Sequence, residues 1–277
     1  MSKDDMSKDG LRIGRVVVDE AGGRRVAIEV SPDSPWFEGH FPGHPVLPAM
    51  AQIGLVARLA PKGAIASLDG LRLAQAVHPG DLLTLTLVTA AGDEERGRFS
   101  LSRDGDGAAV SSGTAAWGGG GKVDEGDETL FPDRGDTPDP AAVLPHQPPA
   151  RLAETVLRIG DGGIVCRGRV PQGHPSVQGG AAGSWMALEL AAQAAGVYQA
   201  SLAARENPGA ADPQVGYIVR MRDVRFARPT LPAGKPLEAT VRPEGGGGPF
   251  NLFRIRVDLA GDTVATAVIG TFVPATN

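Results

Sequence analysis

Hydrophobic and polar residues follow a pattern along the first half of this chain that predicts strands around one apolar helix. Alternating stretches at residues 11–18 and 24–30 predict two strands. The run AMAQIGLVARL at residues 49–59 is apolar nearly all round, which predicts a buried helix. Four more strands, bounded by Gly- and Pro-containing turns, are expected after it. They cover residues 67–77, 81–90, 95–103 and 107–117.

The same order of elements begins again in the second half. Strands are expected at residues 151–159 and 163–170, and a Pro- and Gly-rich loop follows at 171–183. The segment from Trp185 to about Ala204 is rich in Ala, Leu and Glu, which favours a helix. The last four strands are expected at residues 217–228, 235–242, 250–260 and 263–273. This internal repeat predicts two copies of an antiparallel sheet wrapped round a central helix.

The repeat predicts how the chain is divided. A length of 277 residues suits two domains. We expect a disordered start at residues 1–10 and a first repeat at 11–117. A Gly-, Asp- and Pro-rich flexible linker follows at 118–142, and a second repeat at 143–274.

Composition and charge exclude several classes of protein. The net charge of -5 gives no basic footprint for nucleic acid. The single cysteine, Cys166, has no partner for a disulfide within the chain, and no Cys/His cluster has zinc spacing. The chain contains no run of 18 or more apolar residues, so no membrane span is predicted. The polar N-terminus lacks the apolar core of a signal peptide. We therefore expect a cytoplasmic protein with no metal, cofactor, nucleic-acid or membrane partner.

A motif before the first predicted helix resembles a known family. Residues 36–48, WFEGHFPGHPVLP, closely resemble the signature F-x-G-H-F-P-G-x-P-V-x-P-G of the type II 3-hydroxyacyl-acyl-carrier-protein dehydratases. Ala49 stands where the family usually has glycine, and residues 77–81 resemble its V-x-P-G-D turn. The resemblance implies an α+β fold of the hot-dog type.

The second half resembles a sister branch, the dehydratase-like partners found with aryl polyene clusters. Residues 144–149, LPHQPP, are similar to that branch's L-P-H-R-P-P opening. Residues 174–193 follow its pattern H-P-x-x-x-G-G, then W-x-x-I/L-E-x-x-A-Q, with Gly183 in place of the usual proline. The two resemblances cover most of residues 11–273 and imply a double hot-dog.

The implied reaction needs three kinds of group. A base must remove the C2 proton, an acid must protonate the leaving hydroxyl, and donors must stabilise the developing oxyanion. By resemblance, His40 is the catalytic histidine. The family's acid lies 14 residues after its histidine, but Gly54 stands there. The first predicted helix therefore lacks its own acid.

The missing acid is expected from the other repeat. Glu189 lies between two leucines on the second apolar helix, where burying a carboxylate is costly. Family sites form between two hot-dog units, so the resemblance implies a composite site of His40 and Glu189. His174 is either a catalytic histidine facing Gly54 in an incomplete mirror site or a plain loop residue.

Further candidates would bind substrate or its carrier. Donors are expected from backbone amides of Gly183, Ser184 and Trp185 at the start of the second helix, and Trp185 either lines the acyl channel or belongs to the core. Phe41 and Gly43 are expected beside His40.

The remaining histidines are expected to be structural or exposed: His44, His78 and His146. An arginine-rich strand either docks an acidic carrier protein or is a solvated face: Arg220, Arg222, Arg225 and Arg228.

The sequence thus predicts dehydration of (3R)-3-hydroxyacyl thioesters, carried by acyl carrier protein or CoA, in fatty-acid or polyketide synthesis. A thioesterase or enoyl-CoA hydratase is an alternative, since one fold hosts several chemistries. A catalytically silent partner of another dehydratase is a second alternative. Exposed sheet edges make a homodimer of the fused chain plausible.

Overall fold

The computed structural model describes most of the chain. It covers residues 8–19, 23–60, 63–89, 95–121, 123, 131–135, 137–206 and 215–274. Part of the predicted disordered start, residues 1–7, lies outside the described residues, as do 122, 124–130 and 136 of the predicted linker.

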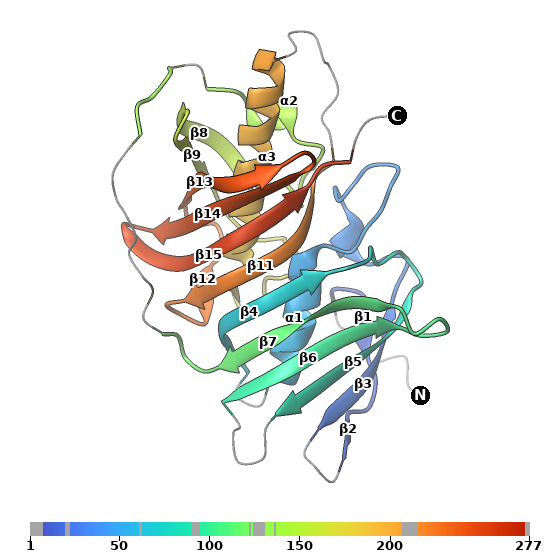
Figure 1. Cartoon of the computed structure of the whole chain (residues 1–277). Helices are drawn as coiled ribbons and strands as arrows, with labels where there is room; N and C mark the ends of the chain where they lie inside the picture. Colours follow the sequence, from blue (N-terminus) through green and yellow to red (C-terminus); the bar gives the residue numbers. More distant parts are fainter. Residues whose placement is uncertain are drawn as a thin grey trace.

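The first half contains one helix and a set of antiparallel strands (Figure 1). Helix α1 spans Ala49–Leu59, as predicted, and the short 3-10 helix η2 spans Pro35–Phe37. The strands are β1 (Leu11–Ile13), β2 (Val17–Val18), β3 (Arg24–Val30), β4 (Ile65–Leu73), β5 (Leu82–Thr89), β6 (Arg96–Arg103) and β7 (Ala109–Trp117).

The second half repeats this order with a longer helix. Helix α3 spans Met186–Glu206, and the short helix α2 spans Pro140–Val143. The strands are β8 (Ala153–Gly160), β9 (Gly163–Gly168), β10 (Ala181–Gly183), β11 (Tyr217–Phe226), β12 (Thr230–Pro232), β13 (Leu237–Gly247), β14 (Phe250–Leu259) and β15 (Asp262–Phe272). The predicted order of strands, one long helix and further strands is found in both halves, together with short elements that the sequence did not predict.

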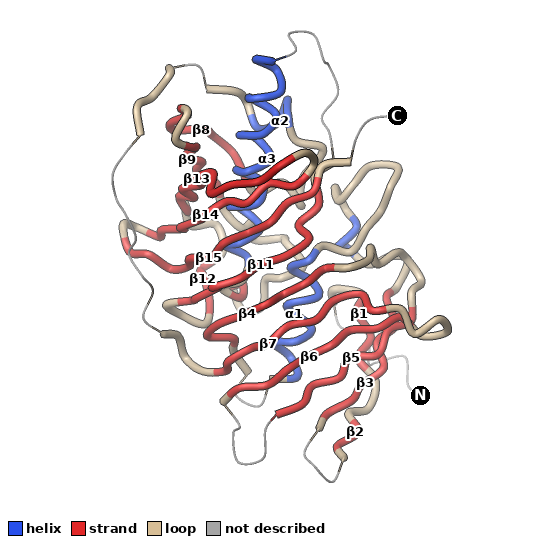
Figure 2. Tube along the Cα trace, in the orientation of Figure 1, coloured by secondary structure: helices blue, strands red, loops and turns tan. Residues whose placement is uncertain are grey.

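The two halves share one continuous sheet. The strand order is β1-β3-β5-β6-β7-β4-β11-β15-β14-β13-β9-β8, with β2 beside β3 and all pairs antiparallel. The repeats join where β4 pairs with β11, with Leu71 opposite Met221. Figures 1 and 2 show α1 behind the first half of this sheet and α3 behind the second. This is the α+β double hot-dog predicted from the sequence.

Apolar burial explains why both helices lie against the sheet. Met50, Ile53 and Leu55 of α1 are at most 1% exposed, and Leu188 and Leu190 of α3 are fully buried. Because removing apolar surface from water is the main force of folding, these faces hold each helix in place. The inner face of the sheet and the two helices therefore form one core.

Two features were not expected. Strands β10 and β12 pair in a separate two-stranded sheet formed from Gly- and Pro-rich loops.

Residues 131–135, assigned to the flexible linker, pack on the second repeat instead. Phe131 is buried, and its carbonyl accepts a hydrogen bond of 3.1 Å from Arg158. The buried Phe131 ring and the hydrogen bonds that Asp133 and Arg134 make with Ile159 hold this part of the linker against β8.

Candidate active site

A tight loop between η2 and α1 holds His40. The Phe41 and His44 backbone groups bond each other, and the Val46 N–H donates to the His40 carbonyl at 3.0 Å. Gly43 lies at the tip with φ of +77°, a conformation that favours glycine. His40 Nδ1 is 2.8 Å from the Val46 carbonyl. Since a carbonyl only accepts, Nδ1 carries the hydrogen and Nε2 keeps its lone pair.

Glu189 lies in the first turn of α3 and is 7% exposed. Gln193, one turn later on the same face, donates to Glu189 Oε1 at 2.9 Å and to the Ala150 carbonyl at 2.8 Å. The Gln193 carbonyl oxygen accepts from the amides of Leu152 and Ala153. These four bonds fix the Gln193 side chain, and through it the position of the buried carboxyl.

The segment 144–149 packs against the His40 loop and adds a third group. The Gln147 N–H donates to the Gly39 carbonyl at 3.0 Å. A Cβ atom on Gly39 would lie 2.0 Å from the Gln147 carbonyl oxygen, so only glycine allows this approach. His146 thereby lies beside His40, with ring centroids 5.2 Å apart. Its Nε2 is 3.7 Å from Glu189 Oε1, too long for a direct hydrogen bond.

His146 is the functional candidate that sequence reasoning missed. It was expected to be structural, yet the structure brings His40, His146 and Glu189 together, with donor atoms all within 4.8 Å of one another. The signal available in the sequence was the L-P-H-Q-P-P motif itself, which places a histidine between prolines in a segment otherwise poor in chemical groups.

Burial sets the protonation states of these groups. It raises the pKa of Glu189 to about 7, although the hydrogen bond from Gln193 opposes the shift. Burial lowers the pKa of His40 to about 4. The pKa of His146 falls well below its ordinary value because of burial, with the charges of His40 and Arg151 adding to the shift. Near neutral pH the histidines are therefore neutral and Glu189 holds a proton in much of the population.

A large cavity connects the cluster to the exterior. Its volume is about 1280 Å³, and both repeats contribute walls. His40, Phe41, His146, Glu189 and Gln193 line it. Apolar side chains make up much of the rest, among them Leu73, Ala192, Ala200, Leu202, Ile218 and Phe272. Neutral imidazole and carboxyl groups in a large, mostly apolar cavity suit proton transfer on a substrate with an acyl chain.

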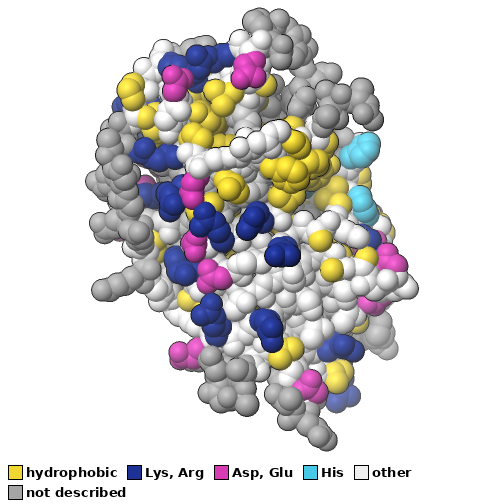
Figure 3. Space-filling view, in the orientation of Figure 1, with side chains coloured by type: hydrophobic (Ala, Val, Ile, Leu, Met, Phe, Trp, Pro, Cys, Tyr) yellow, Lys and Arg dark blue, Asp and Glu magenta, His cyan; other side chains and the backbone are white. Residues whose placement is uncertain are grey.

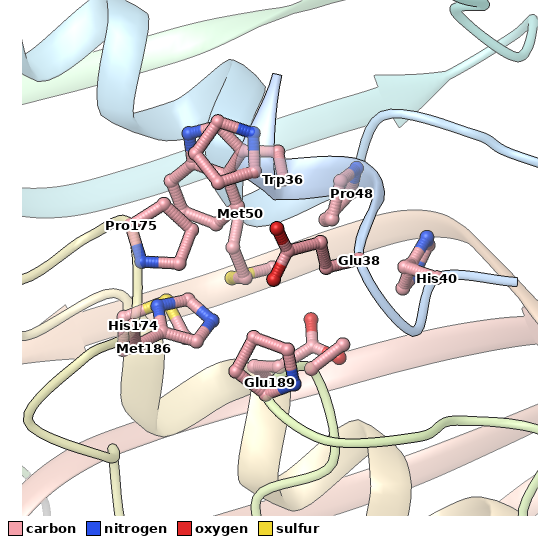
Figure 4. A pocket seen from close by; sticks show the side chains of 12 residues that line it. Trp36, Glu38, His40, Pro48, Met50, His174, Pro175, Met186 and Glu189 are labelled. Carbon is pink, nitrogen blue, oxygen red and sulfur yellow. The ribbon is translucent and has the colours of Figure 1, made fainter. Parts of the chain in front are cut away.

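Among the described residues, His174 at the mirror position belongs to no comparable cluster. His174 bonds the hydroxyl of its neighbour Ser176 at 2.7 Å, and its ring lies edge-on to Trp36 at 5.2 Å. A Cβ on Gly54 would meet Trp185 Cζ2 at 3.0 Å, so the indole fills the space a side chain would need. Figure 4 shows His174 across a narrow pocket from His40, with Glu189 projecting from α3. Helix α1 supplies no acid to His174.

Of the predicted substrate-binding residues, some lie at the large cavity and others lie away from it. Phe41 lines the large cavity and stacks on His40 at 4.1 Å, whereas Gly43 lies at the exposed loop tip. Gly183, Ser184 and Trp185 do not line the cavity. The Ser184 N–H donates to the Pro229 carbonyl at 3.1 Å. These three residues therefore lie away from the large cavity, and their role as donors stays a prediction.

The first turn of α3 borders the cavity at Glu189, and so does the start of α1. Ala49, its first residue, lines the cavity together with His40. The first N–H groups of a helix lack partners within the helix and lie at the positive end of its dipole. Donors for an oxyanion are available there, on the helix that follows His40 in sequence.

The cluster also has the composition of a metal site. Two imidazoles and a carboxylate could hold a divalent cation. Proton transfer by the neutral histidines and Glu189 needs no metal, and the sequence predicts none.

We expect dialysis against EDTA to leave turnover unchanged, measured against an undialysed sample. Loss of activity that added Zn²⁺ restores would contradict this prediction.

Comparison with known proteins gives the same picture of the fold. The ApeP dehydratase family (ApeP-like) matches residues 138–277, and the ApeI dehydratase family (ApeI-like) matches residues 18–114. No helix within the described ranges has the length and apolar character needed to cross a membrane.

Curated relatives match a shorter stretch. The 3-hydroxyacyl-acyl-carrier-protein dehydratase FabZ of Chloroflexus aggregans is 42% identical over 88 residues, which are 27% of this chain and 61% of that protein. FabZ of Staphylococcus carnosus is 47% identical over 88 residues, with the same shares of 27% and 61%. The chain thus spans about three fifths of the length of these relatives.

Solved structures match over nearly the whole chain. The dehydratase domain of PpsC from Mycobacterium tuberculosis, solved in complex with C12:1-CoA, has a TM-score of 0.67 and 18% identity, covering 98% of this chain and 100% of that one. The dehydratase domain of RzxB from Pseudomonas fluorescens has a TM-score of 0.68 and 16% identity, covering 94% and 97%. At this identity the likeness shows the shared fold.

Proposed function

This chain belongs to the ApeP-like dehydratase family, with an ApeI-like dehydratase domain in its first half, and we propose that it dehydrates (3R)-3-hydroxyacyl thioesters. The observation that carries this proposal is the composite cluster. His40 from the first repeat and Glu189 from the second meet in one cavity, where burial favours the neutral form of each.

The reaction then follows from the geometry. His40 Nε2 accepts the C2 proton, and the C–H electron pair moves toward the thioester carbonyl. The N–H groups at the start of α1 stabilise the oxygen that becomes negative. Electrons return to form the C2–C3 double bond as the C3–O bond breaks, and Glu189 gives its proton to the departing hydroxyl, which leaves as water.

His146 supports Glu189 in this scheme. Its Nε2 lies 3.7 Å from the carboxyl, so a small movement brings the two groups into a hydrogen bond that orients Glu189. His40 is the better base because the Val46 carbonyl fixes its tautomer, whereas His146 Nδ1 is buried and has no hydrogen-bond partner.

The direct test uses enoyl thioesters and follows loss of their ultraviolet absorbance on hydration, the reverse reaction. Several acyl lengths on acyl carrier protein and on CoA should be compared, with free thiol measured in parallel. Hydration without thiol release supports a hydro-lyase. Thiol release would favour a thioesterase, and no turnover with any substrate would favour the silent-partner alternative.

The shifted pKa values predict a bell-shaped pH profile for dehydration. Glu189 must be protonated, so kcat/KM should fall as the pH rises through about 7. His40 must be neutral, so kcat/KM should fall as the pH drops through about 4. Initial rates with a 3-hydroxyacyl thioester from about pH 3 to pH 9 check this. A profile still rising at pH 9 would rule out Glu189 as the acid.

A further inference from the structure

The three clustered groups of the cavity have the donor set of a transition-metal site. His40, His146 and Glu189 come from segments far apart in the sequence, yet their donor atoms all lie within 4.8 Å of one another. Two imidazole nitrogens and one carboxylate oxygen suit Zn²⁺ and similar ions, whereas Mg²⁺ and Ca²⁺ prefer oxygen ligands alone. Among the residues that the structure describes, no second group of His, Cys, Asp or Glu side chains is arranged in this way.

The spacing of the donor atoms is close to that of a zinc site. Ligand atoms held by Zn²⁺ at about 2.0–2.2 Å in a tetrahedron lie roughly 3.3–3.6 Å from one another. His146 Nε2 and Glu189 Oε1 are already 3.7 Å apart. The wider separations in the cluster stay within 4.8 Å, and side-chain rotation at the cavity wall closes them. A cation between the three groups therefore requires little rearrangement of the protein.

Hydrogen bonds behind the cluster support two of the ligands in the way that metal sites require. A metal-binding histidine usually donates its second ring N–H to a carbonyl or a carboxylate. His40 Nδ1 is 2.8 Å from the Val46 carbonyl, which leaves the Nε2 lone pair to bind an ion. Gln193 donates to Glu189 Oε1 at 2.9 Å and so fixes the carboxylate, whose other lone pairs are left for a cation.

Charges near the cluster act in both directions on a cation. The carboxylate of Glu189 attracts it, and so does the net charge of -5 of the whole chain. The charge of Arg151, which acts on His146, opposes it. Figure 3 shows Lys and Arg side chains gathered over the outer face of the sheet, which therefore does not compete for cations. The cavity wall, with its carboxylate and imidazoles, is the favourable place.

We propose that His40, His146 and Glu189 form an inhibitory site for Zn²⁺. Three protein ligands leave a fourth position, which faces the cavity and takes a water molecule. The bound ion occupies the lone pair of the base and the oxygens of the acid in the proposed dehydration, so Zn²⁺ and the acyl thioester exclude each other. Zn²⁺ is thus a competitive inhibitor and not a cofactor. The inhibition rests on the proposed function, whereas the metal binding does not.

Isothermal titration calorimetry of the metal-free chain with Zn²⁺ tests the site, with Mg²⁺ as the ion that should not bind. The wild type should bind one Zn²⁺ at the cluster. His146→Ala and Glu189→Gln should each weaken this binding by more than about 100-fold, since the loss of an outer-shell group alone weakens metal binding by about 10–100-fold. Glutamine keeps the size of Glu189, so this variant tests the ligand set even if His146→Ala folds poorly. Arg151→Gln should bind Zn²⁺ more tightly, because it removes a positive charge near His146.

His78→Ala is the matched control, since His78 is exposed and lies outside the cluster, and it should bind Zn²⁺ as the wild type does. Binding that survives in both ligand variants would place the ion elsewhere and overturn the site, and so would the absence of Zn²⁺ binding.

Inhibition is measured with an acyl thioester. Zn²⁺ should raise KM with kcat unchanged, and EDTA should restore the original KM. Zn²⁺ that binds at the cluster without raising KM would overturn the inhibitory role. If the wild type turns over no thioester, the proposed function and the inhibitory role fall together, while calorimetry still decides the metal site.

Discussion

Glu189→Gln should lower turnover by roughly 10³-fold, the scale of a lost general acid. Glutamine keeps the size of the side chain and can still accept the hydrogen bond from Gln193, so the local packing should survive. It has no acidic proton to give to the leaving hydroxyl. The measurement is kcat with a 3-hydroxyacyl thioester, with Glu154→Gln on the exposed surface of β8 as the control. Full retained activity would exclude the composite site.

Thermal unfolding distinguishes this loss of chemistry from a loss of fold. Burial raises the pKa of Glu189 from 4.5 to about 7, so the folded state binds a proton that the unfolded state releases. The associated stability is complete below about pH 4.5 and is lost as the pH rises through about 7. The wild type and Glu189→Gln should therefore melt alike at pH 5, and the variant should melt higher at pH 8.

Features that depend on a short stretch of sequence, such as helix limits and motif residues, were predictable from local patterns. The apolar run at residues 49–59 predicted the limits of α1, because a helix that is apolar on all sides is stable only when it is buried. The positions of Glu189 on α3 and of His40 before α1 were likewise predictable, since each residue lies in a distinctive motif. Gln193 also belongs to such a motif, but only the structure shows it bonding Glu189 and the backbone of residues 150–153.

Long-range contacts were not predictable in the same way. The position of His146 depends on Gly39 meeting the backbone of Gln147, a contact between segments more than a hundred residues apart in sequence. The facing of Leu71 and Met221 depends on the register between β4 and β11, which no local pattern specifies. Which residues at the two helix starts border the cavity also depends on long-range packing. Only the packing of the repeats shows that Ala49, and not Ser184, meets the cavity.

The final prediction separates the two histidine positions. His40→Ala should lower turnover by roughly 10³-fold, because it removes the base at the only cluster in the described chain that joins a histidine to Glu189 across a large cavity. His174→Ala should cost only a few-fold, because the Trp185 indole fills the space beside Gly54 where an acid would stand.

The comparison needs a stability measurement, because His174 is buried and its removal loses the contact with Ser176. Melting temperatures of both variants, with the exposed His78→Ala as a control, show how much of any loss comes from unfolding. A small loss for His174→Ala at temperatures where it is folded, beside a large loss for His40→Ala, supports one working site in each fused chain. Equal large losses in two well-folded variants would mean that both positions work, or that the repeats pair differently in the active assembly.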